Sequence, residues 1–158
     1  VGDRDTESAV ILHEHSVITR DFGEAVLRCL PPADFTPGPE DYKAREDLRG
    51  ICICSVDPPG CKDIDDALSC ELLPNGNMRV GVHIADVTHF VLPDTAVDRE
   101  AAERCTTVYL VERRTDMFPG LLTTDICSLR GGVERLTFSV LWEMTPAAEI
   151  VGTRYVKA

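Results

Sequence analysis

Four aspartates fall within one ten-residue segment, and their spacing is that of a site for a divalent cation. They are Asp57, Asp63, Asp65 and Asp66. Carboxylates this close repel one another, and a protein that keeps them ionised usually neutralises the charge with bound metal. In an extended segment Asp63 and Asp65 project to the same side, and the turn at Pro58-Pro59-Gly60 returns Asp57 beside them. The segment therefore predicts a cluster of oxygen ligands.

Hard oxygen ligands of this kind favour Mg²⁺, with Mn²⁺ as the alternative ion, over zinc. A magnesium ion held by a few carboxylates keeps positions for water and phosphate oxygens, which is typical of phosphoryl chemistry. Two plainer interpretations stay open, namely a solvated acidic turn and a calcium-binding loop that only stiffens the fold. The ligand order of an EF-hand is missing from 57–66 and from the residues downstream, so the calcium loop has weak support.

Histidines and cysteines near this segment offer a second set of metal ligands, but their spacing favours structural roles. His83, Asp86 and His89 recur every third residue. In a strand His83 and Asp86 point to opposite faces, so a shared metal would need a bend, and a hydrogen-bonded core histidine is the better interpretation. The seven cysteines lack the spacing of a zinc ribbon or of a disulfide scaffold. We expect free thiols and a reducing compartment.

The composition is that of an ordinary globular protein with an excess of acid. The 158 residues are 44% hydrophobic and 27% charged, with a formal net charge of −11, which fits one domain or part of one. No apolar run approaches the roughly 20 residues of a membrane span, and the polar first residues do not resemble a secretory signal. We therefore expect no membrane association. The acidity argues against binding of a phosphate backbone by this segment alone, although bound metal would offset part of the charge.

The elements expected around the aspartates alternate without a strict strand-helix-strand rhythm. Helices are expected at 22–30, at 40–49 with Gly50 as the stop, and at 98–109 with Thr95 as the N-cap and Tyr109 at the end. Strands are expected at 9–12, 51–56, 67–73, 78–84, 136–144 and 150–156, with the turn at 74–77 closing a hairpin. This mixture predicts the α+β class, with a mixed or antiparallel sheet and packed helices.

Four motifs, in this order along the chain, resemble those of the ribonuclease II (RNB) family. They are DPPGCKDIDDAL at 57–68, VGVHIADV at 80–87, AERCTTVYL at 102–110 and CSL at 127–129. The wording CICSVDPPGC at 52–61 and the leader GDRDTE at 2–7 are most similar to the eukaryotic branch of the family, which supplies the catalytic exoribonuclease of the exosome. The resemblance covers nearly the whole chain.

The resemblance implies a magnesium-dependent, processive 3′-to-5′ hydrolysis of single-stranded RNA that releases nucleoside 5′-monophosphates without sequence specificity. All four aspartates match the family's metal-binding and catalytic positions. Asp57, Asp63 and Asp66 would hold metal and phosphate. Asp65 would be the residue most sensitive for cleavage, and Tyr109 would pack on the 3′-terminal nucleotide. The implied partners are single-stranded RNA and the core subunits of the exosome, with no DNA, in the nucleus, including the nucleolus, and in the cytoplasm.

The same resemblance divides the chain. Residues 1–38 would be a leading segment whose strand at 9–12 ends a preceding OB-fold domain, and residues 39–158 would be the N-terminal part of the RNB catalytic domain. The family's later arginine, aromatic clamp and remaining helices would lie beyond Ala158, so we expect an incomplete active site. Cys105 stands where the family often has glycine. The alternative is an inactive RNB-like scaffold that binds RNA or exosome partners, and the intact aspartates count against it.

Overall fold

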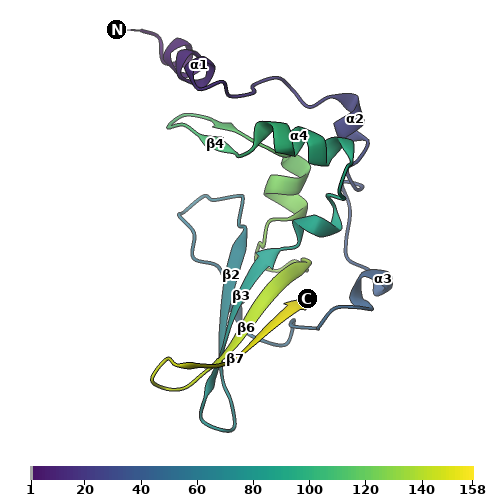
Figure 1. Cartoon of the computed structure of the whole chain (residues 1–158), viewed down its shortest axis with the longest axis vertical. Coiled ribbons are helices and arrows are strands. Elements are labelled where there is room, and N and C mark those ends of the chain that lie inside the picture. Colours follow the sequence, from purple (N-terminus) through teal and green to yellow (C-terminus); the bar gives the residue numbers. More distant parts are fainter. Residues whose placement is uncertain (1) are drawn as a thin grey trace.

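A five-stranded antiparallel sheet forms one end of the molecule, and most of the helices gather at the other (Figure 1). The computed structural model describes residues 2–158. The helices are α1 (Arg4–Glu14), α2 (Glu24–Leu27), α3 (Pro39–Tyr42), the 3₁₀-helix η1 (Val87–His89), α4 (Ala96–Arg104) and the π-helix η2 (Leu122–Ile126). The strands are β1 (Ile53–Cys54), β2 (Asp66–Leu72), β3 (Met78–Ala85), β4 (Val108–Tyr109), β5 (Arg114–Thr115), β6 (Thr137–Met144) and β7 (Ile150–Lys157).

The sheet has the order β1-β2-β3-β6-β7, and every neighbouring pair is antiparallel. The turn between β2 and β3 places Gly76 at a φ of 84°, a conformation that glycine adopts without steric cost. The α+β class is confirmed. The strands predicted at 67–73, 78–84, 136–144 and 150–156 are also confirmed, as β2, β3, β6 and β7, within two residues at their ends. The strand predicted at 51–56 is too long, because only Ile53 and Cys54 pair with β2 before the chain leaves the sheet edge.

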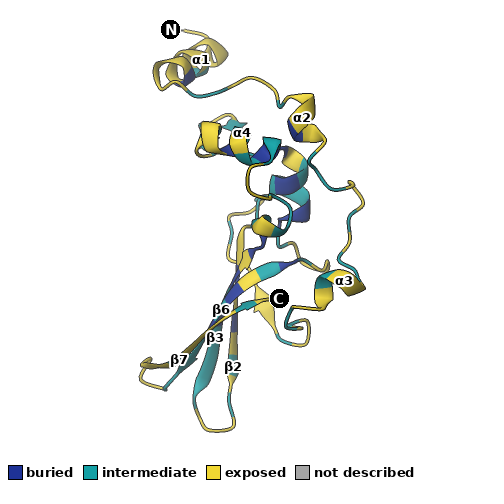
Figure 2. Cartoon of the chain, turned by 45° about the vertical axis from the view of Figure 1, so that its right-hand side comes forward, coloured by how far each residue is buried: buried dark blue, intermediate teal, exposed yellow. Residues whose placement is uncertain are grey.

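The hydrophobic core lies where the helices meet the end of β3. It contains Val26 of α2, Val97 of α4, Leu122 of η2, Ala85 of β3 and Cys127. Figure 2 shows the buried residues concentrated in this region, whereas the hairpin ends of the sheet are exposed or half-buried. Within residues 2–158, no helix has both the length and the apolar character needed to cross a membrane.

Residues 9–12 are helical, so the strand predicted there is wrong. They belong to α1, whose N-cap Asp3 accepts a hydrogen bond from the Thr6 amide at 3.4 Å. Two acidic residues in the first turn also favour the helix, because they face the positive end of its dipole. These local interactions outweigh the strand preference of the β-branched residues in the segment. The end of an OB-fold domain that was predicted here is therefore not formed as a strand.

Two of the predicted helices are shorter than expected. The helix at 22–30 is confirmed only over the four residues of α2. The helix at 40–49 ends at Tyr42, because the Glu46 amide donates to the Lys157 carbonyl at 2.9 Å and joins the loop to the end of β7. The Glu46 amide therefore bonds to β7 and not to the carbonyl of Tyr42, its partner in a continued α-helix.

His83 is a buried core histidine, as its place in the sequence suggested. The residue is 1% exposed, and its two ring nitrogens lie 2.9 Å from the hydroxyls of Ser69 and Ser139. A Cβ at Gly81 would approach the Ser69 hydroxyl to 2.4 Å, so the glycine makes room for the ring. Burial lowers the pKa of His83. His89 contacts a carboxylate of α3 instead, at 3.2 Å, so the two histidines do not share a site.

Asp86, which follows β3, is the centre of a buried ion network. Its Oδ2 lies 2.7 Å from Arg45 Nη2 and 3.1 Å from Lys157 Nζ, and its Oδ1 accepts from the Thr88 hydroxyl at 2.6 Å. Burial alone would raise the pKa of Asp86, but hydrogen bonds from Thr88, Arg45 and Lys157 lower it overall. The network ties the loop after α3 to β3 and β7.

We expect Asp86→Asn to destabilise the chain by about 3 kcal/mol at pH 7, because it leaves the buried Arg45 without its counter-charge. Since the folded-state pKa is lowered, this stabilisation is fully present above the ordinary value of 3.8 and is lost as the pH falls through the folded value. Urea unfolding at pH 7 and at pH 3 should therefore show a large and then a smaller difference from the wild type. The exposed Asp94→Asn is the control, and equal midpoints for both variants at pH 7 would contradict the network's role.

Candidate active site

The acidic loop, residues 57–66, connects β1 to β2 and begins with a tight turn. The Cys61 amide donates to the Pro58 carbonyl at 3.1 Å, and Gly60 has a φ of 86°. Proline followed by glycine at the two central positions is typical of a type II turn, which requires the positive φ at the second of them. The rigid turn predicted from the sequence is confirmed.

The second half of the acidic loop is held by hydrogen bonds from the CSL motif. Ser128 is 0% exposed. Its hydroxyl donates to the Lys62 carbonyl at 2.7 Å and accepts from the Ile64 amide at 3.3 Å. The Leu129 amide donates to the Ile64 carbonyl at 2.8 Å, and the last amide of β3 donates to the Asp65 carbonyl at 3.0 Å. The backbone between two of the aspartates is therefore fixed against the core.

The four aspartates have different surroundings. Asp57 has a buried Oδ2 that finds no hydrogen-bond partner within residues 2–158. Asp63 is half-buried and contacts the β4–β5 hairpin. Asp65 and Asp66 are exposed as whole residues. Partial desolvation of its carboxyl group, followed by the charges of the neighbouring aspartates, raises the pKa of Asp65.

The carboxylates are close enough to repel one another but do not form a coordination shell. Across the described part of the chain, no three side chains of His, Cys, Asp or Glu are arranged to hold a metal ion. The pKa of Asp65 is raised first by desolvation and then by the charges of Asp63, Asp66 and Asp57, so repulsion between the carboxylates contributes to the shift. The loop is an anionic surface whose charge is only partly compensated.

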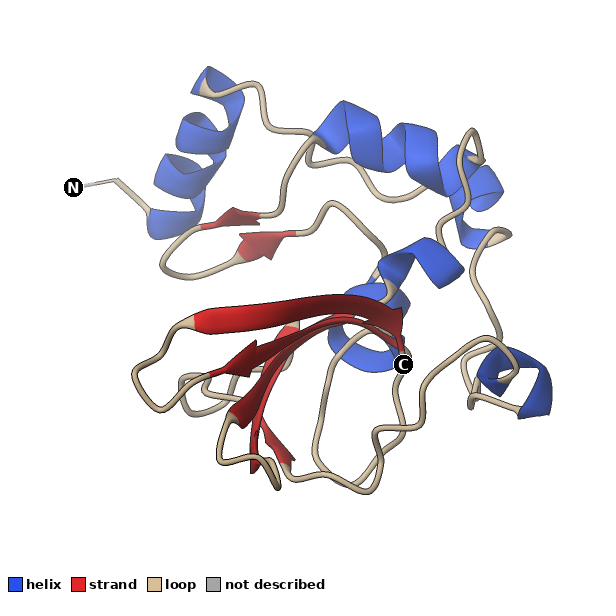
Figure 3. Ribbon diagram, turned by 60° about the horizontal axis from the view of Figure 1, so that its bottom comes forward, coloured by secondary structure: helices blue, strands red, loops and turns tan. Residues whose placement is uncertain are grey.

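The β4–β5 hairpin lies between α1 and the main sheet (Figure 3). Two of its side chains contact Asp63 of the acidic loop. Tyr109 and Arg114 are direct cross-strand neighbours in the hairpin. The Tyr109 hydroxyl donates to Asp63 Oδ2 at 2.8 Å, and Arg114 Nη1 lies 2.7 Å from the same oxygen. The structure thus brings Tyr109 to the aspartates, although from a strand and not from the end of the predicted helix.

The helix predicted at 98–109 begins as expected but ends at Arg104. Its N-cap Thr95 accepts from the Asp98 amide at 3.4 Å. Cys105 then adopts φ 68° and ψ −46°, and the Thr106 amide donates to the Arg104 carbonyl at 2.8 Å. These values describe a γ-turn, which is strained for a residue with a side chain. The turn redirects the chain from α4 into β4.

A cavity of about 310 Å³ opens beside the acidic loop. Asp63, Asp65 and Tyr109 line it together with Asp116, Thr123 and apolar residues such as Phe118 and Leu122. Tyr109 is 64% exposed, so its ring is available to a ligand. The hydrogen bond to Asp63 raises the pKa of the Tyr109 hydroxyl, which keeps it a donor. The cavity combines anionic groups with an aromatic surface.

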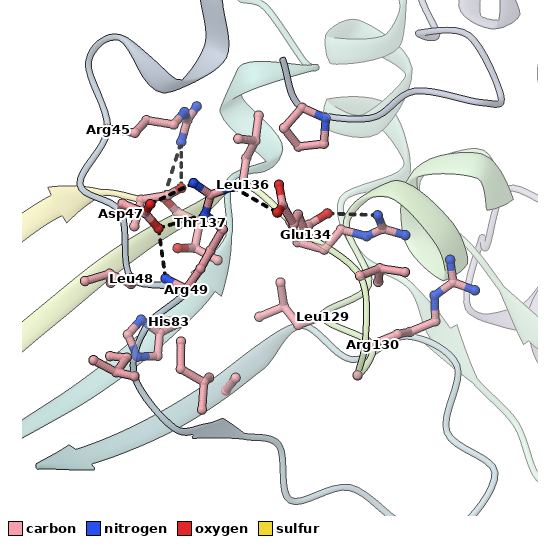
Figure 4. A pocket seen from close by; sticks show the side chains of 18 of the residues that line it. Arg45, Asp47, Leu48, Arg49, His83, Leu129, Arg130, Glu134, Leu136 and Thr137 are labelled. Carbon is pink, nitrogen blue, oxygen red and sulfur yellow. Dashed lines mark hydrogen bonds and ion pairs between the residues drawn. The ribbon is translucent and has the colours of Figure 1, made fainter. Parts of the chain in front are cut away.

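A larger cavity of about 610 Å³ is lined by His83 and by residues from the segments 45–51 and 129–137 (Figure 4). Its arginines are already paired: Arg49 lies 2.7 Å from Asp47 and 2.9 Å from Glu134. None of residues 57–66 lines it. The acidic loop therefore belongs to the smaller cavity.

The acidic loop fits a hard divalent cation by its donor set and by one unsatisfied atom. All four candidate ligands are carboxylates, the donors that Mg²⁺ and Mn²⁺ prefer. The buried Oδ2 of Asp57 lacks the hydrogen bond that a buried polar atom needs, and a cation would satisfy it. The residues that would hold the ion are Asp57, Asp63, Asp65 and Asp66.

The cysteines take no part in this surface as ligands. All seven are free, as predicted, among the residues that the structure describes. Cys127 is buried in the core, where desolvation and then the charge of Asp65 raise the pKa of its thiol to about 12. A neutral, buried thiol of this kind is inert.

Sequence reasoning missed Arg114 and gave Ser128 no role beyond its motif. The available signal for Arg114 was weak, because each strand of its hairpin is only two residues long. For Ser128 the signal was a small polar residue between the apolar Cys127 and Leu129. Neither residue could be connected to the acidic loop without knowledge of the tertiary fold.

Comparison with known proteins identifies the family. Residues 45–158 match the model of a family described as the RNB domain. The chain therefore belongs to the RNB family. Among curated relatives, the "Exosome complex exonuclease RRP44 homolog A" of Arabidopsis thaliana is 58% identical over 160 residues. That alignment covers 100% of this chain and 17% of the relative, so the chain spans about one sixth of its length.

Two solved structures share the fold at low sequence identity. Mycoplasma genitalium RNase R, in complex with ribose-methylated single-stranded RNA, superposes with a TM-score of 0.85 at 23% identity, covering 96% of this chain and 23% of that one. Yeast Ssd1, which is described as a pseudonuclease, gives a TM-score of 0.80 at 23% identity, covering 98% and 20%. Because both a nuclease and a pseudonuclease have this fold, the fold alone does not decide between activity and inactivity.

We expect Ser128→Ala to loosen the acidic loop and to destabilise the chain by about 2 kcal/mol, because one buried donor and one buried acceptor lose their partner. Amide hydrogen exchange at Ile64 should accelerate more than exchange in β6. The exposed Ser55→Ala, just before the loop, is the control. Unchanged exchange at Ile64 would show that the hydroxyl does not hold the loop.

We expect Cys105→Gly to stabilise the chain by about 0.5 kcal/mol, because relief of the positive-φ strain exceeds the larger entropy that glycine adds to the unfolded state. Cys105→Ala keeps a Cβ and so keeps the strain, and it serves as the matched control for loss of the thiol. Thermal and urea unfolding compare the three chains. A glycine variant that is less stable than the alanine variant would rule out strain at this turn.

Proposed function

We propose that this chain is the metal-binding part of the catalytic domain of a magnesium-dependent, processive 3′-to-5′ exoribonuclease that hydrolyses single-stranded RNA to nucleoside 5′-monophosphates. The observation that carries the proposal is the acidic loop, where four carboxylates lie beside a cavity that Asp63, Asp65 and the exposed Tyr109 line, and where the buried Oδ2 of Asp57 has no hydrogen-bond partner within residues 2–158. Membership of the RNB family supports the reaction class. The aspartates carry more weight than the fold, because a pseudonuclease shares the fold.

In this proposal the side chains of the acidic loop and the hairpin have separate roles. Asp57, Asp63 and Asp66 hold the metal and, through it, the scissile phosphate, and Asp65 is the carboxylate on which cleavage depends most. Bound Mg²⁺ would supply activation of a water molecule and stabilisation of charge on the departing 3′ oxygen. The hydrogen bonds from Ser128 keep the backbone of the loop in place while these charges change.

Tyr109 would bind the 3′-terminal nucleotide by stacking. Its hydroxyl is fixed by Asp63, so the ring has one orientation beside the cavity. Aromatic stacking accepts every base, which suits an enzyme that must degrade RNA without regard to sequence. The chain's net charge of −11 provides no general phosphate-binding surface, so RNA recognition here would be confined to this site.

We further propose that the protein works with the core subunits of the exosome, in the nucleus, including the nucleolus, and in the cytoplasm. The support is the high identity to proteins named exosome complex exonucleases over the full length of this chain. RNA is the proposed substrate, and no binding of DNA or membranes is proposed.

The test is to titrate Mg²⁺ into the protein and its Asp65→Asn variant and to follow a uniformly labelled single-stranded RNA on the same samples. We expect metal-dependent release of nucleoside 5′-monophosphates that falls by about 100-fold or more in the variant. Asp94→Asn removes the same charge outside the loop and should leave the rate unchanged. Metal binding without hydrolysis by the wild type would mean that the loop binds metal but needs the family's later residues for cleavage, and hydrolysis that Asp65→Asn does not lower would contradict the proposal.

A further inference from the structure

Arg114 is the cation that faces the acidic loop most directly. Its Nη1 lies 2.7 Å from Asp63 Oδ2, and its Nε lies 2.5 Å from Asp116 Oδ1. The side chains of Arg114 and Asp63 are only 23% and 18% exposed, so water screens this pair less than it screens an exposed ion pair. The guanidinium group also lies 5.9 Å from the centre of the Tyr109 ring.

The position of Arg114 is set by the hairpin and not by a flexible tail. Its backbone pairs with Tyr109 across the two strands, and both side chains reach the same oxygen of Asp63. The hairpin itself is tied to α1, because Arg4 Nη1 lies 2.9 Å from Glu112 Oε1 near the tip. The guanidinium therefore stands at a fixed place above the loop.

This contact occupies an oxygen that a metal ion would use. A guanidinium is permanently charged, and its N–H groups donate to the lone pairs through which a carboxylate coordinates metal. Asp63 Oδ2 already accepts from Tyr109 and pairs with Arg114. The Asp63 carboxylate is thus turned toward the hairpin. This agrees with the finding that no three acidic, histidine or cysteine side chains within residues 2–158 are arranged to hold a metal ion.

We propose that Arg114 is a built-in counter-cation that competes with the divalent ion for Asp63. The inference rests on the proposed function, in that it takes the acidic loop to be a site for Mg²⁺ or Mn²⁺. Without metal, the guanidinium neutralises part of the loop's charge and keeps Asp63 near the hairpin. When metal binds, Arg114 leaves Asp63 and keeps its second contact, to Asp116.

Asp116 is what makes this exchange feasible. The contact between Nε and Asp116 Oδ1 does not involve Asp63, so the arginine retains a carboxylate partner after the metal has taken the first one. The adjacent Arg113 has the same charge but is exposed, and neither Asp63 nor Asp116 is among its ion-pair partners in residues 2–158. It therefore provides a matched control on the same hairpin.

The experiment is calorimetric titration of Mn²⁺ and Mg²⁺ into the wild type, Arg114→Gln, Arg113→Gln and Asp57→Asn. We expect Arg114→Gln to bind metal about tenfold more tightly than the wild type, because a competing positive charge next to a ligand is gone. Arg113→Gln should stay within about twofold of the wild type, because its charge is exposed and screened. Arg114→Lys, which keeps the charge, should also stay close to the wild type.

Each outcome separates this inference from the proposed function. Equal affinities for Arg114→Gln and Arg113→Gln, or weaker binding by Arg114→Gln, would overturn the competition while leaving the metal site in place. Wild-type binding that Asp57→Asn does not weaken, or no binding by any chain, would overturn the proposed metal site itself.

Thermal unfolding gives a second measurement that does not depend on activity. In EDTA, Arg114→Gln should unfold at a lower temperature than the wild type, and saturating Mg²⁺ should raise its midpoint by more than it raises that of the wild type. If Arg114→Gln does not fold, Arg114→Met takes its place, since it is neutral and keeps the aliphatic part of the side chain. Equal Mg²⁺-induced shifts in the wild type and the neutral variant would overturn the proposal.

Discussion

Mutual repulsion among the carboxylates of the acidic loop is the constraint to which the rest of the structure responds. A chain free to move would separate these charges, so the loop must be held by groups outside it. Ser128 and Leu129 hold the backbone of the loop by hydrogen bonds, and Tyr109 and Arg114 of the β4–β5 hairpin contact the Asp63 side chain. The aspartates stay together because their backbone is fixed, and their charges are compensated only in part.

The core and the sheet serve this arrangement in different ways. The core packs α2, α4 and η2 against the end of β3, which fixes the start of the CSL motif relative to the strand after the loop. Just after β3, the network around Asp86 joins the loop after α3 to the end of β7. Both sets of contacts meet at the same end of β3, so the site is supported from two directions.

Local signals in the sequence were sufficient for much of the fold and pointed to the acidic loop as the candidate site. Gly60 and Gly76 marked two turns in which the glycine has a positive φ, and Thr95 marked the start of α4. The position of Asp63 and Tyr109 beside one another followed only from the resemblance to a family. That step could not come from local propensity, because 46 residues separate the two side chains.

The errors had tertiary or competing local causes. Residues 9–12 contain β-branched side chains, but a capped first turn made them helical. The helix after Gly38 stopped early because Glu46 bonds to β7, which no local pattern encodes. Arg114 was missed for the same reason, because its partner Asp63 precedes it by 51 residues in the chain.

The π-helical form of η2 sets a limit on the length of the chain just before Ser128. The Cys127 amide reaches back to the Leu122 carbonyl at 3.0 Å, five residues away, so this turn contains one residue more than an α-helical turn would need. The turn accommodates this extra residue locally and leaves the residues after it in register. Ser128 therefore still reaches Lys62 and Ile64. Insertions and deletions should therefore be tolerated in the distant β2–β3 and β6–β7 turns, whereas a further insertion within 122–126 would displace Ser128 from Lys62 and Ile64.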